Sequence, residues 1–291
     1  MGIPGKRFVA CLAAAAGLTL LAGCGSSGVN GISGASSQSV APKITTVADL
    51  SAAITKTTNT KNSAKVTMTL DGTSDGQHVT GTGSGIVQSK PLVSDMTMTM
   101  TGPNDSGTGT TTGQMEVLLV NNALYIKLTG AFAEGLQELG GDAASKPWIK
   151  IDPNGTDPAS KAFGSLVNMA QENNDPGSAL NKMKSAATIT STKQEQLDGQ
   201  STTHYTITVD LQKYAASLPD SDTMKQSLDQ GLQAGAPATE TVDIWAGNQN
   251  LPAKFVMTED GFTITAKYSD WGTPVNVTAP PASQVATLSG N

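Results

Sequence analysis

Apolar and polar residues alternate strictly in four short stretches of this chain, at positions 65–70, 95–100, 205–209 and 262–268. In these stretches an apolar side chain alternates mainly with threonine. Successive side chains of a strand point to opposite faces of its sheet, so the pattern predicts strands with one buried and one solvated face. A sheet that is covered on one face only is typical of antiparallel strands.

Turn signals separate these strands from others. Asn-Asn at 121–122 lies between two apolar runs and predicts a hairpin over residues 117–128. Asp-Gly at 198–199 and at 260–261 predicts two more tight connections. The glycine-rich residues 81–85 indicate either a strand weakened by glycine or a β-bulge.

Apolar residues spaced three or four apart predict helices elsewhere. Thr46 with an acid three residues later resembles the N-terminal cap of a helix. Asp-Pro at 157–158 and at 175–176 predicts two more helix starts, and others are expected near 132–139 and 221–234. Their apolar stripes are narrow, so each helix should pack one side onto the sheet. The predicted class is α+β, one large antiparallel sheet with helices on one face.

The N-terminal segment carries targeting information. Lys6 and Arg7 precede an apolar run over residues 8–21, which is typical of a secretory signal peptide. Leu-Ala-Gly-Cys at 21–24 resembles a bacterial lipobox. That resemblance implies removal of residues 1–23 and acylation of Cys24, which would anchor the chain in the cell membrane on its extracytoplasmic side.

Three segments are expected from this reasoning. Residues 1–23 form the signal peptide, residues 24–44 the lipidated cysteine with a flexible Gly/Ser-rich tether, and residues 45–291 one folded domain. Without residues 1–23 the formal charge moves from −6 to −8, because two basic residues leave with no acid. The remaining basic residues are scattered, so nucleic acid is not expected as a partner.

The chain contains little that predicts catalysis. Cys11 lies in the segment to be removed and Cys24 in the lipobox, which excludes thiol chemistry and cysteine-ligated metal. His78 and His204 fall on the polar side of alternating segments, where exposure to solvent is expected. We expect no enzyme activity, no metal and no cofactor.

The layout of the chain resembles a known group of proteins. A lipobox, a Gly/Ser tether and a first helix lead into a Thr/Met-alternating sheet, and residues 241–245, 251–255 and 263–272 follow as strand, turn and strand. This is similar to actinobacterial lipoproteins of the LppX/LprG type, with a LolA-like fold. The resemblance implies a strongly curved antiparallel half-barrel with helices on its concave face, and an apolar cavity between them for acyl chains of lipids or glycolipids.

Candidate cavity residues are those on the apolar side of the predicted strands. They are Val66, Met68, Leu70, Met96, Met98, Met100, Ile207, Val209, Ile244, Phe262 and Ile264. Methionine is unbranched and adaptable, which suits a surface for varied apolar shapes. The same residues could equally form an ordinary core under the helices.

Two functions follow from these patterns. The first is an anchored lipoprotein that binds a lipid or glycolipid for transport or presentation, with the membrane and that ligand as its partners. The alternative is an anchored, lipid-free module that binds an envelope protein or senses a signal. A cavity of several hundred Å³ would favour the first, and a filled core would favour the second.

Overall fold

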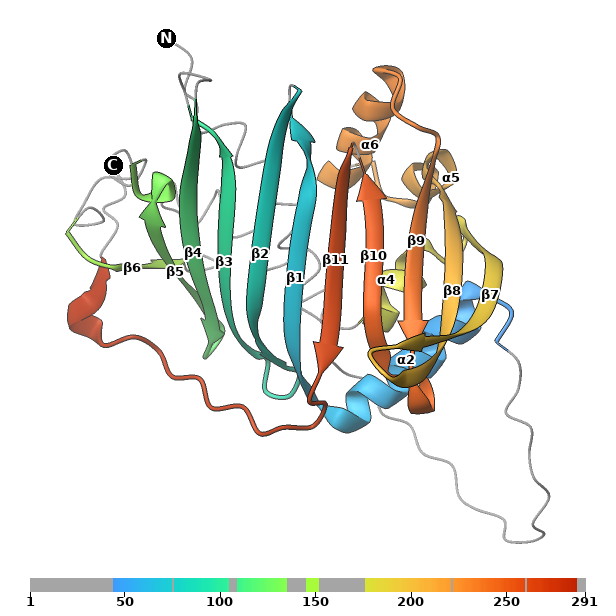
Figure 1. Cartoon of the computed structure of the whole chain (residues 1–291), viewed down its shortest axis with the longest axis horizontal. Coiled ribbons are helices and arrows are strands. Elements are labelled where there is room, and N and C mark those ends of the chain that lie inside the picture. The colour runs from blue at the N-terminus through green and yellow to red at the C-terminus, as the bar shows by residue number, and fades with distance from the viewer. Residues whose placement is uncertain are drawn as a thin grey trace, which may run out of the picture.

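One sheet of twelve strands dominates the computed structural model, which describes residues 44–74, 76–104, 109–134, 145–151, 176–220, 222–259 and 261–286 (Figure 1). The strand order is β12-β6-β5-β4-β3-β2-β1-β11-β10-β9-β8-β7. The strands are β1 (Ser63–Ser74), β2 (Gln77–Gln88), β3 (Val93–Pro103), β4 (Thr110–Val120), β5 (Ala123–Gly130), β6 (Trp148–Ile151), β7 (Ala187–Leu197), β8 (Gln200–Asp210), β9 (Thr239–Ala246), β10 (Pro252–Glu259), β11 (Phe262–Ser269) and β12 (Val285–Ala286).

The alternation in the sequence corresponds to the two faces of this sheet. Every second residue of β3 is buried from Ser94 to Gly102, and the threonines between them face the other side. The hairpin predicted at Asn121 and Asn122 joins β4 to β5, and both asparagines have positive φ, as a type I′ turn requires. The face that carries the apolar residues is called the inner face below, and the threonine-rich face the outer face.

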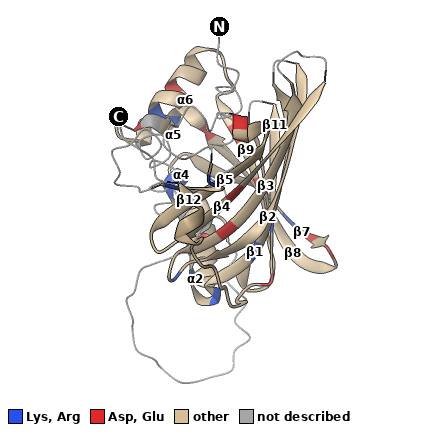
Figure 2. Cartoon of the chain, turned by 90° about the vertical axis from the view of Figure 1, so that its left-hand side faces the viewer, with Lys and Arg blue, Asp and Glu red and all other residues tan. Residues whose placement is uncertain are grey.

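The helices lie together on the inner side of the curved sheet (Figure 2). They are α2 (Val47–Lys61), α4 (Pro176–Met183), α5 (Leu211–Ser217) and α6 (Thr223–Gln233), and two short 3-10 helices cover Asn248–Asn250 and Ala282–Gln284. None of the helices among the described residues is both long and apolar enough to cross a membrane. The predicted α+β class with helices on one face of a large sheet is therefore confirmed.

Local sequence signals correctly predicted the positions of three helices. Thr46 caps α2 by accepting a hydrogen bond from the backbone N–H of Asp49. The helices expected after Asp175 and near residues 221–234 correspond to α4 and α6. The short α5 was not predicted, and Asp210 caps it directly at the end of β8. The helix expected after Asp157 lies outside the described residues, as does most of that expected at 132–139.

The expectation of a purely antiparallel sheet was wrong at one edge. Strand β12 pairs with β6 in parallel, whereas the other strand pairs among the described residues are antiparallel. The segment after β11 runs along one end of the sheet to reach this edge (Figure 1). Val277 and Ala279 of that segment pack against Leu118 and Trp148, which explains why a two-residue strand can be held there.

Apolar side chains on the inner face fall into separate groups. Over β8 and β9, Leu50 and Ile54 of α2 and Leu180 of α4 form one cluster with Ile207 and Val242. Over β1 to β6, a second cluster is built from the strands themselves and includes Met68, Met96, Met98 and Met115. The described helices thus cover mainly one half of the sheet.

Candidate functional site

A row of glycines runs along the inner face of β2. Gly81, Gly83 and Gly85 occupy alternate positions, and Val79 and Val87 continue the row at its two ends. Strand β2 pairs in register with both neighbours through this stretch, so the glycines form a regular strand and not a bulge. Since glycine has no side chain, the inner face is lowered along these three positions.

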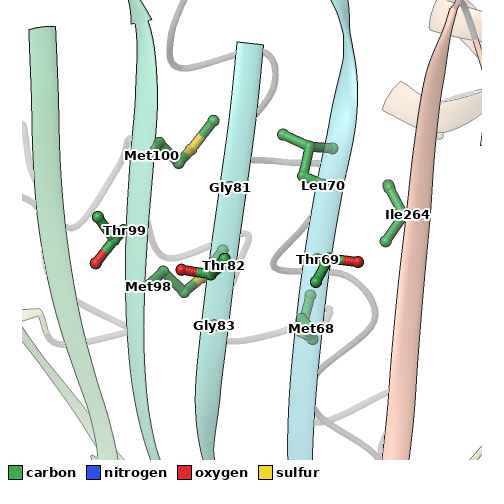
Figure 3. Close-up of a pocket in the computed structure, with 10 residues that line it drawn as sticks. All are labelled: Met68, Thr69, Leu70, Gly81, Thr82, Gly83, Met98, Thr99, Met100 and Ile264. Atoms are coloured by element: carbon green, nitrogen blue, oxygen red, sulfur yellow. The ribbon is translucent and has the colours of Figure 1, made fainter.

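Longer side chains flank the glycine row on both sides. Each glycine pairs with one apolar residue on β1 and one methionine on β3. The three rows are Leu70–Gly81–Met100, Met68–Gly83–Met98 and Val66–Gly85–Met96. We call these nine residues the methionine trough. Figure 3 shows Gly81 and Gly83 between Met98 and Met100 on one strand and Met68 and Leu70 on the other.

The three glycines differ in how closely their neighbours approach. A Cβ atom at Gly85 would collide with the Asp95 carbonyl oxygen and lie 2.5 Å from the Met96 sulfur, so only glycine fits there. A Cβ at Gly83 would lie 3.4 Å from Met98 Cγ, an ordinary van der Waals contact. The trough is therefore filled by the Met96 side chain at Gly85 and is open enough for a small side chain at Gly83.

The trough ends at larger side chains. At the far end from Val87, Leu70 and Met100 form a cluster with Val79 and Ile264, against which Phe132 packs. The Phe132 ring also lies over Gly113, where a Cβ would be only 2.6 Å from the ring. Apolar groups thus line the trough along its length and close it at this end.

The free space in the trough is small. The cavity lined by Met68, Leu70, Met98, Met100 and Ile264 has a volume of about 10 Å³, enough for one water-sized sphere. This is far below the several hundred Å³ of a typical ligand pocket. Among the described residues, the side chains at this place therefore pack against one another rather than around an open cleft.

The structure brings together eight of the eleven predicted cavity residues and separates three. The eight lie in the two adjoining clusters around the trough and are Val66, Met68, Leu70, Met96, Met98, Met100, Phe262 and Ile264. Ile207, Val209 and Ile244 share the cluster of α2 and α4 instead. These three lie beneath helices, whereas the eight surround the glycine row that sequence reasoning had not assigned to the site.

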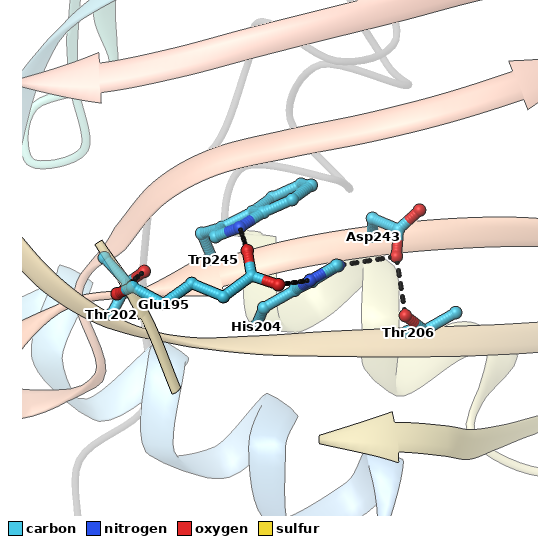
Figure 4. Close-up of polar contacts among 6 residues, drawn as sticks. All are labelled: Glu195, Thr202, His204, Thr206, Asp243 and Trp245. Atoms are coloured by element: carbon cyan, nitrogen blue, oxygen red, sulfur yellow. Dashed lines mark hydrogen bonds and ion pairs between the residues drawn. The ribbon is translucent and has the colours of Figure 1, made fainter. Parts of the chain in front are cut away.

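A polar cluster occupies the outer face, on the opposite side of the sheet (Figure 4). The two ring nitrogens of His204 on β8 lie 3.0 Å from Glu195 Oε1 on β7 and 2.7 Å from Asp243 Oδ1 on β9. Trp245 donates its indole N–H to the second Glu195 oxygen at 2.9 Å. His204 was expected to be solvent-exposed, but only 15% of its side chain is exposed because carboxylates and a ring surround it.

Trp245 has no free ring face. The His204 ring stacks on it with 4.0 Å between centroids, and the Lys254 ammonium lies 4.3 Å from the ring centroid. A face covered by the imidazole has no room for an ammonium group, so Lys254 must lie over the other face. Both faces of the Trp245 ring are thus in contact with side chains of the fold, and this cluster joins β7, β8 and β9.

Hydrogen bonds from Trp245 and His204 lower the pKa of Glu195 below its ordinary value of 4.5. A carboxyl with a lowered pKa stabilises the fold above its unfolded-state pKa, and this contribution is lost as the pH falls through the folded-state value. We expect Glu195→Gln to be less stable than the parent protein near pH 7 and the difference to shrink below about pH 4.5. Urea unfolding from pH 3 to 7 measures this, and an equal difference at every pH would contradict it.

The described residues contain no group of three or more His, Cys, Asp or Glu side chains placed to hold a metal ion. The two threonine hydroxyls of the polar cluster do not donate to His204: Thr206 donates to Asp243 at 2.8 Å and Thr202 to the Glu195 carbonyl oxygen at 3.1 Å. The chemistry of the methionine trough is therefore apolar contact, and that of the outer cluster is hydrogen bonding within the fold.

Sequence comparisons identify relatives in Streptomyces, and no family model matches the chain. It is 28% identical over 194 residues to an uncharacterized 31.2 kDa protein of Streptomyces griseus, covering 56% of this chain and 63% of that protein. It is 29% identical over 203 residues to a Streptomyces coelicolor protein named "Putative lipoprotein", covering 67% of this chain and 59% of that protein. The chain thus spans about three fifths of the length of these relatives.

Comparison of structures finds two mycobacterial lipoproteins. LprF of Mycobacterium bovis has a TM-score of 0.43 and 14% identity, with 80% of this chain and 96% of LprF covered. LppX of Mycobacterium tuberculosis has a TM-score of 0.41 and 16% identity, with 80% of this chain and 98% of LppX covered. LppX, which names the group that the sequence resembles, is among the structural neighbours of the chain.

Proposed function

We propose that this protein is a membrane-anchored envelope lipoprotein that binds the acyl chain of a lipid or glycolipid in the methionine trough, for transport or presentation. The observation that carries this proposal is the glycine row on β2, flanked by Met68 and Leu70 on one side and by three methionines on the other. At Gly83 the neighbouring atoms leave room for a small side chain, so packing alone does not require a glycine there.

The lining of the trough suits an acyl chain. It offers apolar side chains, and burying each CH₂ group of a ligand contributes about 0.8 kcal/mol. Methionine has a flexible, polarisable side chain that adapts to different apolar shapes. Because the free cavity is only about 10 Å³, an entering chain must displace Met68 and Met98 from their positions over Gly83.

Anchoring belongs to the same proposal. The lipobox-like residues 21–24 would make Cys24 the acylated first residue, and residues 25–44 would tether the domain to the extracytoplasmic side of the membrane. One acyl chain gives weak, reversible attachment, so stable anchoring takes more than one. We further propose that the protein has no catalytic activity and acts through binding alone.

Native mass spectrometry of the protein purified from its own envelope tests this function. We expect a bound mass that disappears on extraction with organic solvent and is identified as a lipid or glycolipid. An unliganded mass that persists after incubation with envelope lipids would contradict it. That outcome would favour the alternative, a lipid-free interaction module, for which the small cavity is the supporting observation.

A further inference from the structure

Ser94 on β3 is a buried polar residue whose hydroxyl has no hydrogen-bond partner among the described residues. Only 1% of the residue is exposed, and its hydroxyl makes no hydrogen bond among the residues that the structure describes. Buried polar groups in proteins are nearly always hydrogen-bonded, because an unpaired one has lost its bonds to water and gained none in return. An unpaired buried hydroxyl therefore needs an explanation.

The position of Ser94 connects it to the methionine trough. It lies on the inner face of β3, in the same row as Met96, Met98 and Met100. Across the sheet it pairs with Val87 on β2 and Leu119 on β4, both buried. Val87 is the residue that ends the glycine row, so Ser94 stands beside that end of the trough.

The surroundings of Ser94 are otherwise apolar. Val87, Leu119 and Met96 belong to one hydrophobic cluster, and Ala64 of the same cluster pairs with Val87 from the other side. Alanine at position 94 would occupy less space and leave no polar atom unpaired. A hydroxyl is thus retained where packing and hydrogen bonding within the described fold give no reason for one.

We propose that the Ser94 hydroxyl donates a hydrogen bond to the ester carbonyl oxygen of a bound acyl lipid, and so fixes which way the lipid lies. The carbonyl end would sit beside Val87. The chain would displace the Met96 side chain from Gly85 and extend over Gly83 and Gly81 towards Met100. This inference rests on the proposed function and adds to it a ligand class, an ester-linked acyl chain, and an orientation.

A hydroxyl kept for a ligand has a consequence for stability in the free protein. We expect Ser94→Ala to unfold at the same temperature as the parent protein or higher, because it removes an unpaired buried group. Ser63 is the matched control, since it is also buried but donates its hydroxyl to the Thr273 carbonyl oxygen at 2.6 Å. Ser63→Ala should therefore lower the melting temperature. A decrease for Ser94→Ala like that for Ser63→Ala would overturn the inference.

Binding of two defined probes provides the decisive test. Methyl palmitate carries an ester carbonyl and heptadecane does not, and competition of each against a fluorescent fatty-acid probe gives the ratio of their affinities. We expect this ratio to fall about three- to tenfold in Ser94→Ala, which is the usual range for one lost hydrogen bond, while heptadecane binding is retained. Because only the ratio is compared between proteins, differences in probe solubility cancel.

The outcomes separate the inference from the function on which it rests. If both probes bind and the ratio is the same in Ser94→Ala and the parent protein, the hydroxyl does not contact the ester, and the inference is overturned. If the parent protein binds neither methyl palmitate nor heptadecane, nor the fluorescent probe, the proposed function itself fails, and the inference fails with it.

Discussion

Replacing Leu50 with alanine is expected to lower the free energy of unfolding by about 2–5 kcal/mol. Leu50 is fully buried on α2, in the cluster that joins this helix to Ile207 and Val242 of the sheet. The loss combines the transfer free energy of the removed carbons with the cavity that remains, and the neighbouring strands cannot close that cavity because their hydrogen-bonded ladder holds them apart.

Chemical denaturation of the Leu50→Ala variant measures this loss. Lys56→Ala on the exposed side of the same helix is the control and should change stability by less than about 0.5 kcal/mol. A similarly small effect for Leu50→Ala would show that α2 does not stabilise this half of the sheet.

Replacing Gly83 with valine is expected to reduce the amount of bound lipid at least tenfold. A Cβ at this position makes ordinary contacts with Met98 Cγ and Met68 Cβ, so the first carbon is accommodated. The two γ-methyl groups then occupy the lowered part of the inner face between these methionines. An acyl chain therefore has no room to lie over Gly83. The added side chain also overpacks the inner face, which should lower the free energy of unfolding by about 1–3 kcal/mol.

The control for Gly83→Val is Thr82→Val, which places the same side chain one residue earlier. Thr82 is exposed on the outer face, so valine there does not touch the trough. Native mass spectrometry of both variants gives the lipid content, and circular dichroism confirms that both are folded. Equal lipid content in folded Gly83→Val and Thr82→Val would remove the glycine row from the binding site.

Strands with one buried and one solvated face could be predicted from the sequence. The alternation in β1, β3, β8 and β11 follows from the two-residue period of a strand, and the turn residues between them have the positive φ that Asn and Gly tolerate. The cap at Thr46 was readable for a similar reason, because the hydrogen bond to Asp49 spans only three residues. Local geometry determines these features, so local sequence predicts them.

Features that depend on residues far apart in the chain could not be predicted from local sequence patterns. Residues 81–85 predicted either a weak strand or a bulge. The local sequence could not distinguish the two, because the distinction depends on how the neighbouring strands pair with this segment. The exposure expected for His204 was wrong because Glu195 and Trp245 reach it from two other strands. The parallel pairing of β12 depends on a segment that crosses one end of the sheet.

Sequence patterns were sufficient to predict which residues of a strand share a face, where several helices begin and that the class is α+β. Those properties depend on backbone periods and on contacts within a few residues. Three features came from the three-dimensional arrangement alone: Gly83 lies between Met68 and Met98, helices cover Ile207, and the Ser94 hydroxyl at the end of the glycine row has no partner among the described residues. Strand order and register bring these residues together, and both result from the packing of the whole sheet.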